Sequence, residues 1–382
     1  MAQRNLDRDL ADKYRYLEFL YNATHPQEFC TSLPHQFFVE STNICNCRCE
    51  FCIQTKMKRP KGKMEFSLLK KIVDQVVFFD PYFDFCRQGE ALLHPQITDM
   101  IEYAIRAGMT KTRLVTNGRF LREDLAQRII TGGLPILHIS FNGYNRKSYE
   151  RYQKKAHWEE TMTNILEFLR LKYEMKSATP KIEISMVKYS SLAENQSAFF
   201  ELFNKLPLDK IRINSCINFF GQNPDPIFDR NVQRPFNEWP TCKVPWRFFN
   251  INWDGDVTPC IVDYDSKYSA GNVNDERILD IWNNKKWQYL RKCHIEKKFD
   301  LIESKHGKFC DCCNELWNNP KDHGPQFPET FEQGAREFFQ TKKIQAGRFQ
   351  DSIIKSDAQI AREFKYFIAN YEKIYDKIVL SE

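Results

Sequence analysis

The sequence predicts an α/β fold that is built on a parallel sheet. Strand-like and helix-like segments alternate six times between residues 36 and 216. Polar residues with useful chemistry follow the strands, since Cys45, Glu90, Asn117 and Ser140 lie at the ends of the first four. Such alternation implies right-handed crossovers, in either a doubly wound sheet or an incomplete (β/α)6 barrel. In both architectures the chemistry lies at the carboxyl ends of the strands.

Local composition justifies each element of this pattern. Short runs of aromatic and β-branched residues indicate strands. The predicted strands are residues 36–42, 83–87, 112–116, 136–141, 181–187 and 211–216. Apolar residues at helical spacing, such as Leu69, Ile72 and Val76, indicate helices. The predicted helices are residues 5–22, 66–79, 96–107, 121–131, 158–174 and 190–205.

The pattern changes after Cys216. Residues 221–240 are rich in Pro and Asn and are typical of a linker. Residues 248–260 predict a hairpin, because Asp254 and Gly255 form a strong tight-turn signal. Further helices are expected over residues 282–292, 329–343 and 357–378.

Composition excludes several classes of protein. The 382 residues carry 56 basic and 50 acidic side chains, a net charge of +6 that does not indicate a nucleic-acid partner. A hydrophobic content of 42% argues against disorder. No apolar run approaches the ~18 residues of a membrane span, and the polar N-terminus is unlike a secretory signal. We therefore expect a cytoplasmic protein that binds neither membrane nor nucleic acid.

The chain has 13 cysteines, an odd number in a long sequence without a secretory signal. Such cysteines are more typical of metal ligands than of disulfides. Four of them lie within residues 45–52, and three more lie within residues 310–313. This clustering predicts two thiolate sites.

The first cluster has the spacing C-x3-C-x2-C, formed by Cys45, Cys49 and Cys52 directly after the first strand. Three thiolates on one loop can hold three irons of a 4Fe-4S cluster and leave the fourth iron open for another ligand. The alternative at this point is a zinc site that takes Cys47 or a later cysteine as its fourth ligand.

With this loop in its place, the sequence resembles the radical S-adenosylmethionine (SAM) superfamily, whose fold is a partial (β/α)6 barrel. Residues 88–91, 114–118 and 140–143 resemble three further family segments in the same order. The resemblance implies a SAM-binding 4Fe-4S cluster on the three cysteines. It also implies a group of SAM contacts, namely Phe51, Gln88, Gly89, Glu90, Asn117 and Ser140.

Each of these contacts has a distinct expected role. Phe51 is expected near the adenine, and Ser140 near the ribose or the carboxylate of SAM. The backbone of Gln88 and Gly89 and the carboxylate of Glu90 are expected to take the methionine ammonium, through a charge-assisted hydrogen bond. The sequence departs from the family pattern where Gln88, Ala91 and Asn142 replace Gly, Pro and Asp.

The second cluster resembles the SPASM/twitch extension of radical SAM enzymes. Cys242, Gly255 and Cys260 give the spacing C-x12-G-x4-C, and Cys310 and Cys313 follow as C-x2-C. No cysteine lies beyond residue 313, so the resemblance implies one auxiliary 4Fe-4S cluster on these four cysteines. A cluster with four protein ligands moves electrons and binds no substrate. A structural zinc site on the same four residues is the alternative, and Cys312 is an alternative ligand.

Four regions follow from these assignments. We expect an N-terminal helical extension at 1–35, a barrel at 36–220, a SPASM/twitch domain at 221–320 and a C-terminal helical extension at 321–382. The two extensions are expected to pack over the domains, with partner docking as the alternative. The basic loop 56–63 is expected to be solvated, or to attract an acidic electron donor or an anionic substrate.

The resemblance implies an enzyme that cleaves SAM reductively to a 5′-deoxyadenosyl radical, which abstracts hydrogen from an unactivated C–H bond. A flavodoxin or ferredoxin-type protein is the implied electron donor. Oxidation of the substrate then needs an electron acceptor, for which the auxiliary cluster is suited. Epimerisation needs a hydrogen donor, for which Cys216 is the first candidate and Cys86 the second.

The first 35 residues are too few for a leader-binding domain, which favours a small polar substrate such as a sugar or an aminoglycoside. A radical SAM peptide maturase or epimerase is the alternative within the family. An iron–sulfur electron-transfer module and a zinc scaffold are the alternatives of another class.

Overall fold

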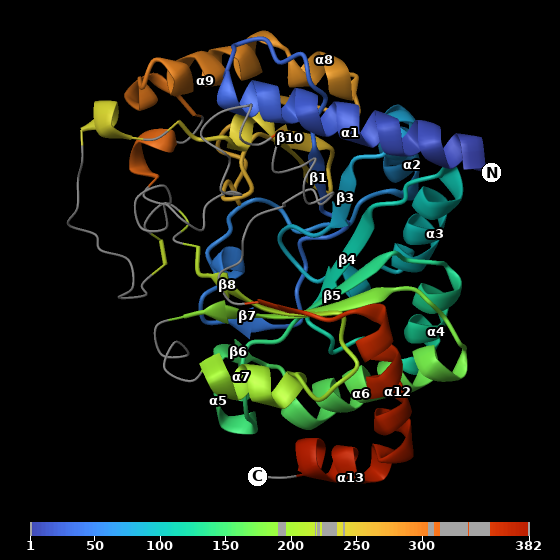
Figure 1. Ribbon diagram of the computed structural model, residues 1–382. Coiled ribbons are helices and arrows are strands. Elements are labelled where there is room, and N and C mark those ends of the chain that lie inside the picture. Colours follow the sequence, from blue (N-terminus) through green and yellow to red (C-terminus); the bar gives the residue numbers. More distant parts are fainter. Residues whose placement is uncertain are drawn as a thin grey trace.

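A computed structural model gives the architecture of the chain (Figure 1). The structure describes residues 2–189, 196–217, 219, 222–223, 235–239, 241–304, 309–313, 335 and 352–380. In this described part of the chain, no helix has the length and apolar character that crossing a membrane requires.

A largely parallel sheet forms the centre of the molecule, with the strand order β11-β10-β9-β1-β3-β4-β5-β7-β8-β12. Its six central strands run parallel in the order β1-β3-β4-β5-β7-β8. They are β1 (Gln36–Val39), β3 (Tyr82–Phe85), β4 (Thr112–Thr116), β5 (Ile136–Ser140), β7 (Lys181–Lys188) and β8 (Lys210–Ser215). The predicted α/β fold class and all six predicted strands are confirmed.

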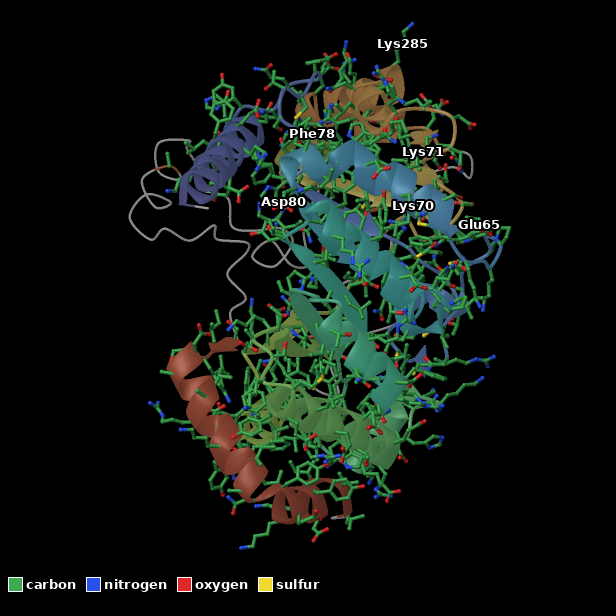
Figure 2. The ribbon with its side chains drawn as sticks, turned by 90° about the vertical axis from the view of Figure 1, so that its right-hand side faces the viewer. Glu65, Lys70, Lys71, Phe78, Asp80 and Lys285 are labelled. Atoms are coloured by element: carbon green, nitrogen blue, oxygen red, sulfur yellow. The ribbon has the colours of Figure 1, made fainter. Side chains whose placement is uncertain are left out.

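Helices cover one face of this sheet, and Figure 2 shows α2, α3 and α4 side by side on it. The helices that connect the parallel strands are α2 (Phe66–Val76), α3 (Ile97–Ala107), α4 (Glu123–Thr131), α5 (Arg146–Tyr152), α6 (Trp158–Glu174) and α7 (Gln196–Phe203). Strand side chains alternate between faces. Phe37, Phe83, Leu114 and Leu137 are therefore buried in the apolar core, while their neighbours in sequence face the other side.

The expected hairpin is present and joins the same sheet. Its strands are β9 (Phe248–Ile251) and β10 (Asp256–Thr258), which are antiparallel, and β11 (Gly271–Asn272) follows. Strand β9 pairs in parallel with β1, an arrangement that local sequence did not indicate. The later segment therefore lies directly beside the strand that precedes the first cysteines.

The remaining helices lie at the two ends of the molecule (Figure 1). Helices α8 (Ile278–Trp282) and α9 (Lys285–Ile295) lie near α1 (Ala2–Thr24) at one end. At the other end are α12 (Asp357–Ala369) and α13 (Tyr371–Tyr375), followed by a π-helical turn at Asp376–Leu380. The helix expected over 329–343 lies outside the described residues except at position 335, as does most of the linker expected over 221–240.

Besides the pairing of β9 with β1, three further features were not expected from the sequence. Strand β12 (Ser352–Ile354) pairs antiparallel with β8, so the C-terminal extension contributes to the sheet as well as helices. Helix α5 was missed. So was the small sheet of β2 (Arg48–Cys49) and β6 (Gln153–Lys154), which anchors the cysteine loop.

Candidate functional site

The first cysteine loop follows β1 and is fixed by side chains at its base. Thr42 donates its hydroxyl to the carbonyl of Gly62 over 2.7 Å, and the Asn43 amide donates to the carbonyl of Pro60 over 2.8 Å. The amide oxygen of Asn43 accepts from the backbone N–H of Gly62 over 2.9 Å. These bonds close the loop at its two ends, and the pairing of β2 with β6 fixes its middle.

A cavity of about 190 Å³ lies between this loop and the carboxyl ends of the strands. All nine residues predicted for the first site line it. They are Cys45, Cys49, Cys52, Phe51, Gln88, Gly89, Glu90, Asn117 and Ser140. The structure thus brings together residues that are spread over almost one hundred positions, as expected for a parallel sheet whose strand ends share one edge.

Glu90 is a buried carboxylate with a fixed orientation. It accepts hydrogen bonds from the hydroxyl of Thr116 (2.7 Å), the backbone N–H of Asn117 (2.7 Å) and the backbone N–H of Leu92 (3.1 Å). Burial raises the pKa of Glu90, and these three bonds oppose that rise. Because all three donors are neutral, the carboxylate is suited to a cationic ligand group in the cavity.

Gly89 lies where the chain passes very close to the cysteine loop. Its φ is +106°, and an added Cβ would lie 2.4 Å from the carbonyl oxygen of Thr42 and 2.8 Å from the Cα of Asn43. The next residue donates its backbone N–H to the carbonyl of Ile44 over 2.9 Å. Only glycine fits this position, whereas Gln88 lies in a place that tolerates a side chain.

Asn117 and Ser140 lie in hydrogen-bond networks at the rim of the cavity. The Asn117 amide donates to the side chain of Asn46 over 2.7 Å, which ties β4 to the cysteine loop. The Asn142 amide donates to Ser140 (3.2 Å) and to Gln153 (3.0 Å). The oxygen of the same amide accepts from the backbone N–H of Val187 over 2.9 Å. Position 142 therefore needs both a donor and an acceptor, which an amide side chain supplies.

The candidate hydrogen donors lie in different surroundings. Cys216 is buried in the core, is not among the residues that line the cavity, and accepts a hydrogen bond from the Asn223 amide over 3.1 Å. Cys86 does line the cavity. Burial raises the pKa of Cys86 to about 12, so its thiol keeps its hydrogen at neutral pH.

A second, smaller cavity of about 30 Å³ contains the other predicted ligands. Cys242, Cys260, Cys310 and Cys313 all line it, together with His294 and apolar side chains that include Trp239 and Phe299. Burial raises the pKa of Cys242 to about 11 and that of Cys260 to about 12. The side chain of Cys312, the alternative ligand, lies outside those that the structure describes. Within the described residues, no three His, Cys, Asp or Glu side chains converge as ligands of a single metal ion.

Arg87 connects the two cavities, a role that sequence reasoning missed. It lines the first cavity and donates to the side chain of Asn252 (2.6 Å) and the carbonyl of Asp263 (2.6 Å). It also donates to the hydroxyl of Thr258 over 2.9 Å, and that hydroxyl lies 3.3 Å from the carbonyl of Cys260. The only signal in the sequence was its place beside Gln88.

Glu40 and Arg59 form a buried ion pair at the junction of the same segments. One Arg59 nitrogen donates to Glu40 over 2.6 Å, and a second contacts its other oxygen. Glu40 also accepts from the backbone N–H groups of Gln88 (3.2 Å) and Trp253 (3.3 Å). The loop 56–63 is therefore not simply solvated, because Arg59 is 8% exposed in its side chain.

A strip of polar side chains lies on the same face of the sheet, nearer the start of the strands. Asp84 and Arg113 are joined by two hydrogen bonds of 3.0 and 2.5 Å. His138 lies between Arg212, which donates over 2.8 Å, and Ser185 at 2.7 Å. Because residues two apart share a face, these side chains lie on the same face as Cys86, Val115 and Ser140 of the cavity.

The donor set of each cavity fits an iron–sulfur cluster. In the first, the backbone N–H groups of Cys47 and Gln54 donate to the sulfurs of Cys45 (3.4 Å) and Cys52 (3.5 Å). Such bonds stabilise thiolates. Burial raises the pKa of Cys49, so ionisation of its thiol needs a compensating cation of the kind that iron supplies.

Comparisons with known proteins agree with this geometry. The model of the radical SAM superfamily matches residues 39–180, and that of the SPASM iron-sulfur cluster-binding domain matches residues 242–314. The chain therefore contains a radical SAM domain. A SPASM domain follows it toward the C-terminus. The radical SAM domain binds a 4Fe-4S cluster and SAM, and the SPASM domain binds auxiliary iron–sulfur clusters.

Several relatives match this chain over most of their own length. A tungsten-containing aldehyde ferredoxin oxidoreductase cofactor-modifying protein of Pyrococcus furiosus is 23% identical over 336 residues, 74% of this chain and 94% of that protein. A SAM-dependent 2-deoxy-scyllo-inosamine dehydrogenase of Niallia circulans is 23% identical over 287 residues, 73% of this chain and 92% of that protein. The structure of Streptococcus suis SuiB bound to precursor peptide SuiA has a TM-score of 0.55 at 12% identity, covering 68% of this chain and 67% of that one, and shows the shared fold.

The close approach at Gly89 generates a prediction. Gly89→Ala places a methyl group against the backbone of Thr42 and Asn43, so the cysteine loop is expected to shift and the first cluster to be lost. Iron analysis after anaerobic reconstitution should show about half the iron of the parent protein, if each site holds one 4Fe-4S cluster. Gly133→Ala is the matched control, because its φ is +73° but its Cβ would meet only Ile105 at 3.8 Å. Full iron content in Gly89→Ala would contradict the argument.

Proposed function

We propose that this chain is a radical SAM dehydrogenase that oxidises an alcohol carbon of a small, polar, sugar-like or aminocyclitol-like substrate. The observation that carries the proposal is the pair of cysteine-lined cavities joined through Arg87. One cavity opens onto the strand ends, where a substrate can enter. The other is smaller and is lined by four cysteines and mainly apolar side chains, which suits an electron acceptor and not a substrate site.

In the first cavity, Cys45, Cys49 and Cys52 would hold three irons of the cluster. Glu90 would bind the SAM ammonium beside the backbone of Gln88 and Gly89. The bound cluster and SAM together supply a carbon radical that removes a hydrogen atom from the substrate. The remaining expected contacts, Phe51, Asn117 and Ser140, would orient the adenosyl group and keep water from it.

Removal of hydrogen from an alcohol carbon leaves a radical that still carries one proton and one electron too many for a ketone. The proton passes to solvent, and the electron passes to the auxiliary cluster on Cys242, Cys260, Cys310 and Cys313. One electron enters the protein to cleave SAM, and one electron leaves the substrate radical. The net reaction therefore converts the alcohol and SAM into the ketone, methionine, 5′-deoxyadenosine and a proton. This balance needs an acceptor close to the first cavity, which the connection through Arg87 provides.

The polar strip below the cavity supports a polar substrate. It contains Asp84, Glu183, Arg113 and Arg212, and Glu183 Oε2 lies 3.7 Å from Arg212. The buried oxygen Asn214 Oδ1 has no hydrogen-bond partner within the described ranges, and a substrate hydroxyl that reached it would supply the donor. The relative that acts as a 2-deoxy-scyllo-inosamine dehydrogenase is consistent with this class.

Epimerisation is the second candidate, and one observation favours it. Cys86 lines the first cavity with a thiol that retains its hydrogen, as a hydrogen-atom donor requires. Cys216, the first candidate from sequence, lies in the core, and its role as a donor stays a prediction. Hydrogen returned from a thiol comes ultimately from solvent, which gives the two reactions different isotope patterns.

A flavodoxin or ferredoxin-type protein is the proposed electron donor. Lys58, Lys61 and Lys63 are exposed on the loop that follows the three cysteines. Their positive charge is suited to an acidic donor, and the rate of reduction should then fall as salt screens the attraction.

Deuterium transfer tests the reaction. The reduced protein should cleave SAM, and 2-deoxy-scyllo-inosamine deuterated at its carbinol carbons is the first probe, followed by a panel of deuterated hexoses. We expect deuterium in 5′-deoxyadenosine and one ketone formed for each SAM consumed, by mass spectrometry. An absence of SAM cleavage would overturn the enzyme assignment. Cleavage of SAM without deuterium transfer from any member of the panel would overturn the substrate class. Solvent deuterium in a product that is not oxidised would show that the reaction is an epimerisation and not a dehydrogenation.

The ammonium contact predicts a pH dependence of SAM binding. Because burial raises the pKa of Glu90, the carboxylate takes up a proton as pH falls through that raised value, and affinity for SAM should decrease. Glu90→Gln should bind SAM on the order of tenfold more weakly or worse near neutral pH, and should lose this pH dependence. Equilibrium dialysis of the cluster-loaded protein measures both effects. Glu50→Gln, an exposed acid on the same loop, is the control, and unchanged binding by Glu90→Gln would remove the proposed contact.

A further inference from the structure

His294 is a buried imidazole in the last turn of α9, and neither the cysteine motifs nor the proposed reaction uses it. Its ring lies edge-on to those of Phe299, at 5.0 Å between centroids, and Trp246, at 6.5 Å. It lines the second cavity with the four cysteines. A polar ring in such apolar surroundings needs a specific partner to compensate for its loss of water.

The partner is a cysteine sulfur. Nε2 of His294 lies 3.5 Å from Sγ of Cys310, within hydrogen-bond distance for sulfur. Nδ1 is buried and has no hydrogen-bond partner in the part of the chain that the structure describes. A neutral imidazole carries one N–H group, and placing it on Nε2 satisfies the donor and leaves only an acceptor without a partner. This pattern of partners therefore favours the tautomer that carries its hydrogen on Nε2.

We propose that His294 donates an Nε2–H···S hydrogen bond to Cys310 and thereby raises the reduction potential of the auxiliary cluster. This inference rests on the assignment, made under the proposed function, of Cys242, Cys260, Cys310 and Cys313 as the ligands of that cluster. His294 acts through Cys310 and is a positioning residue, not a catalytic one.

The physical reason is electrostatic. Reduction adds one negative charge to the cluster, and part of that charge is carried by the thiolate sulfurs. A hydrogen bond to a sulfur stabilises the reduced form more than the oxidised form, so the potential rises. Apolar neighbours such as Trp239, Leu290 and Phe309 line this cavity and lower the local dielectric constant, which strengthens the effect of one fixed donor. A higher potential favours transfer of an electron from the substrate to this cluster.

A redox titration followed by electron paramagnetic resonance tests the inference. The parent for the test is the chain with Cys45, Cys49 and Cys52 replaced by Ala, so that only the auxiliary cluster contributes to the spectrum. His294→Leu removes the donor and should lower the midpoint potential. His294→Gln keeps an N–H donor on a similar reach and should restore much of the difference. Leu290→Val, which alters the same cavity one helical turn away, should leave the potential close to that of the parent.

Each outcome decides between alternatives. Equal potentials in His294→Leu and the parent would overturn the hydrogen bond. Loss of iron in both His294 variants, with strong hyperfine coupling to ¹⁵N-histidine in the parent, would show that His294 is an iron ligand and would also overturn it. A weak ¹⁵N coupling in the parent supports the hydrogen bond even where a variant does not fold. A parent that contains no cluster would instead refute the assignment of the four cysteines and the proposed function with it.

Discussion

Glu40 is 1% exposed, and its carboxylate joins three segments that are far apart in the sequence. Through Arg59 it holds the end of the first cysteine loop, through the N–H of Gln88 it holds the end of β3, and through the N–H of Trp253 it holds the turn after β9. Arg59 extends this junction to the carbonyl of Tyr264, 2.7 Å from its Nε. Removal of one partner of such a buried pair typically costs about 3–5 kcal/mol, because the other charge is left without compensation.

The chemistry depends on this junction because the two cysteine sites come from different parts of the chain. Strand β9 lies beside β1 in parallel register, and Arg87 and Glu40 fasten the loops that follow them. The first cavity is thereby placed next to the loop that contains Cys260. An electron acceptor must lie close to the carbon that reacts, so the proposed oxidation requires the connection between the two cavities.

The residues that could be predicted from sequence are those whose signals are local. The spacing of Cys45, Cys49 and Cys52 is contained in one loop, and the strands that carry Glu90 and Ser140 are marked by their own composition. The structure places all of these residues on one cavity. Arg59 was misjudged as part of a solvated loop, because its partner lies 19 positions away and only the folded chain buries both.

Longer-range features had no local signal at all. The pairing of β9 with β1 joins segments more than 200 residues apart, and the aromatic run at residues 248–251 does not reveal which strand it will accompany. Cys216 ends a strand just as Cys86 does, yet only Cys86 lines the cavity. Side-chain direction at the end of a strand depends on the loop that follows, which for Cys216 includes the contact with Asn223.

The central claim is that this chain holds two separate clusters, one on each set of cysteines. Iron and acid-labile sulfide, measured per chain in the anaerobically reconstituted protein, test it most directly. About eight of each are expected for the intact chain. About four are expected when either Cys45, Cys49 and Cys52 or Cys242, Cys260, Cys310 and Cys313 are replaced by Ala. Loss of all iron in both variants, or stoichiometric zinc in place of iron at either site, would contradict the account.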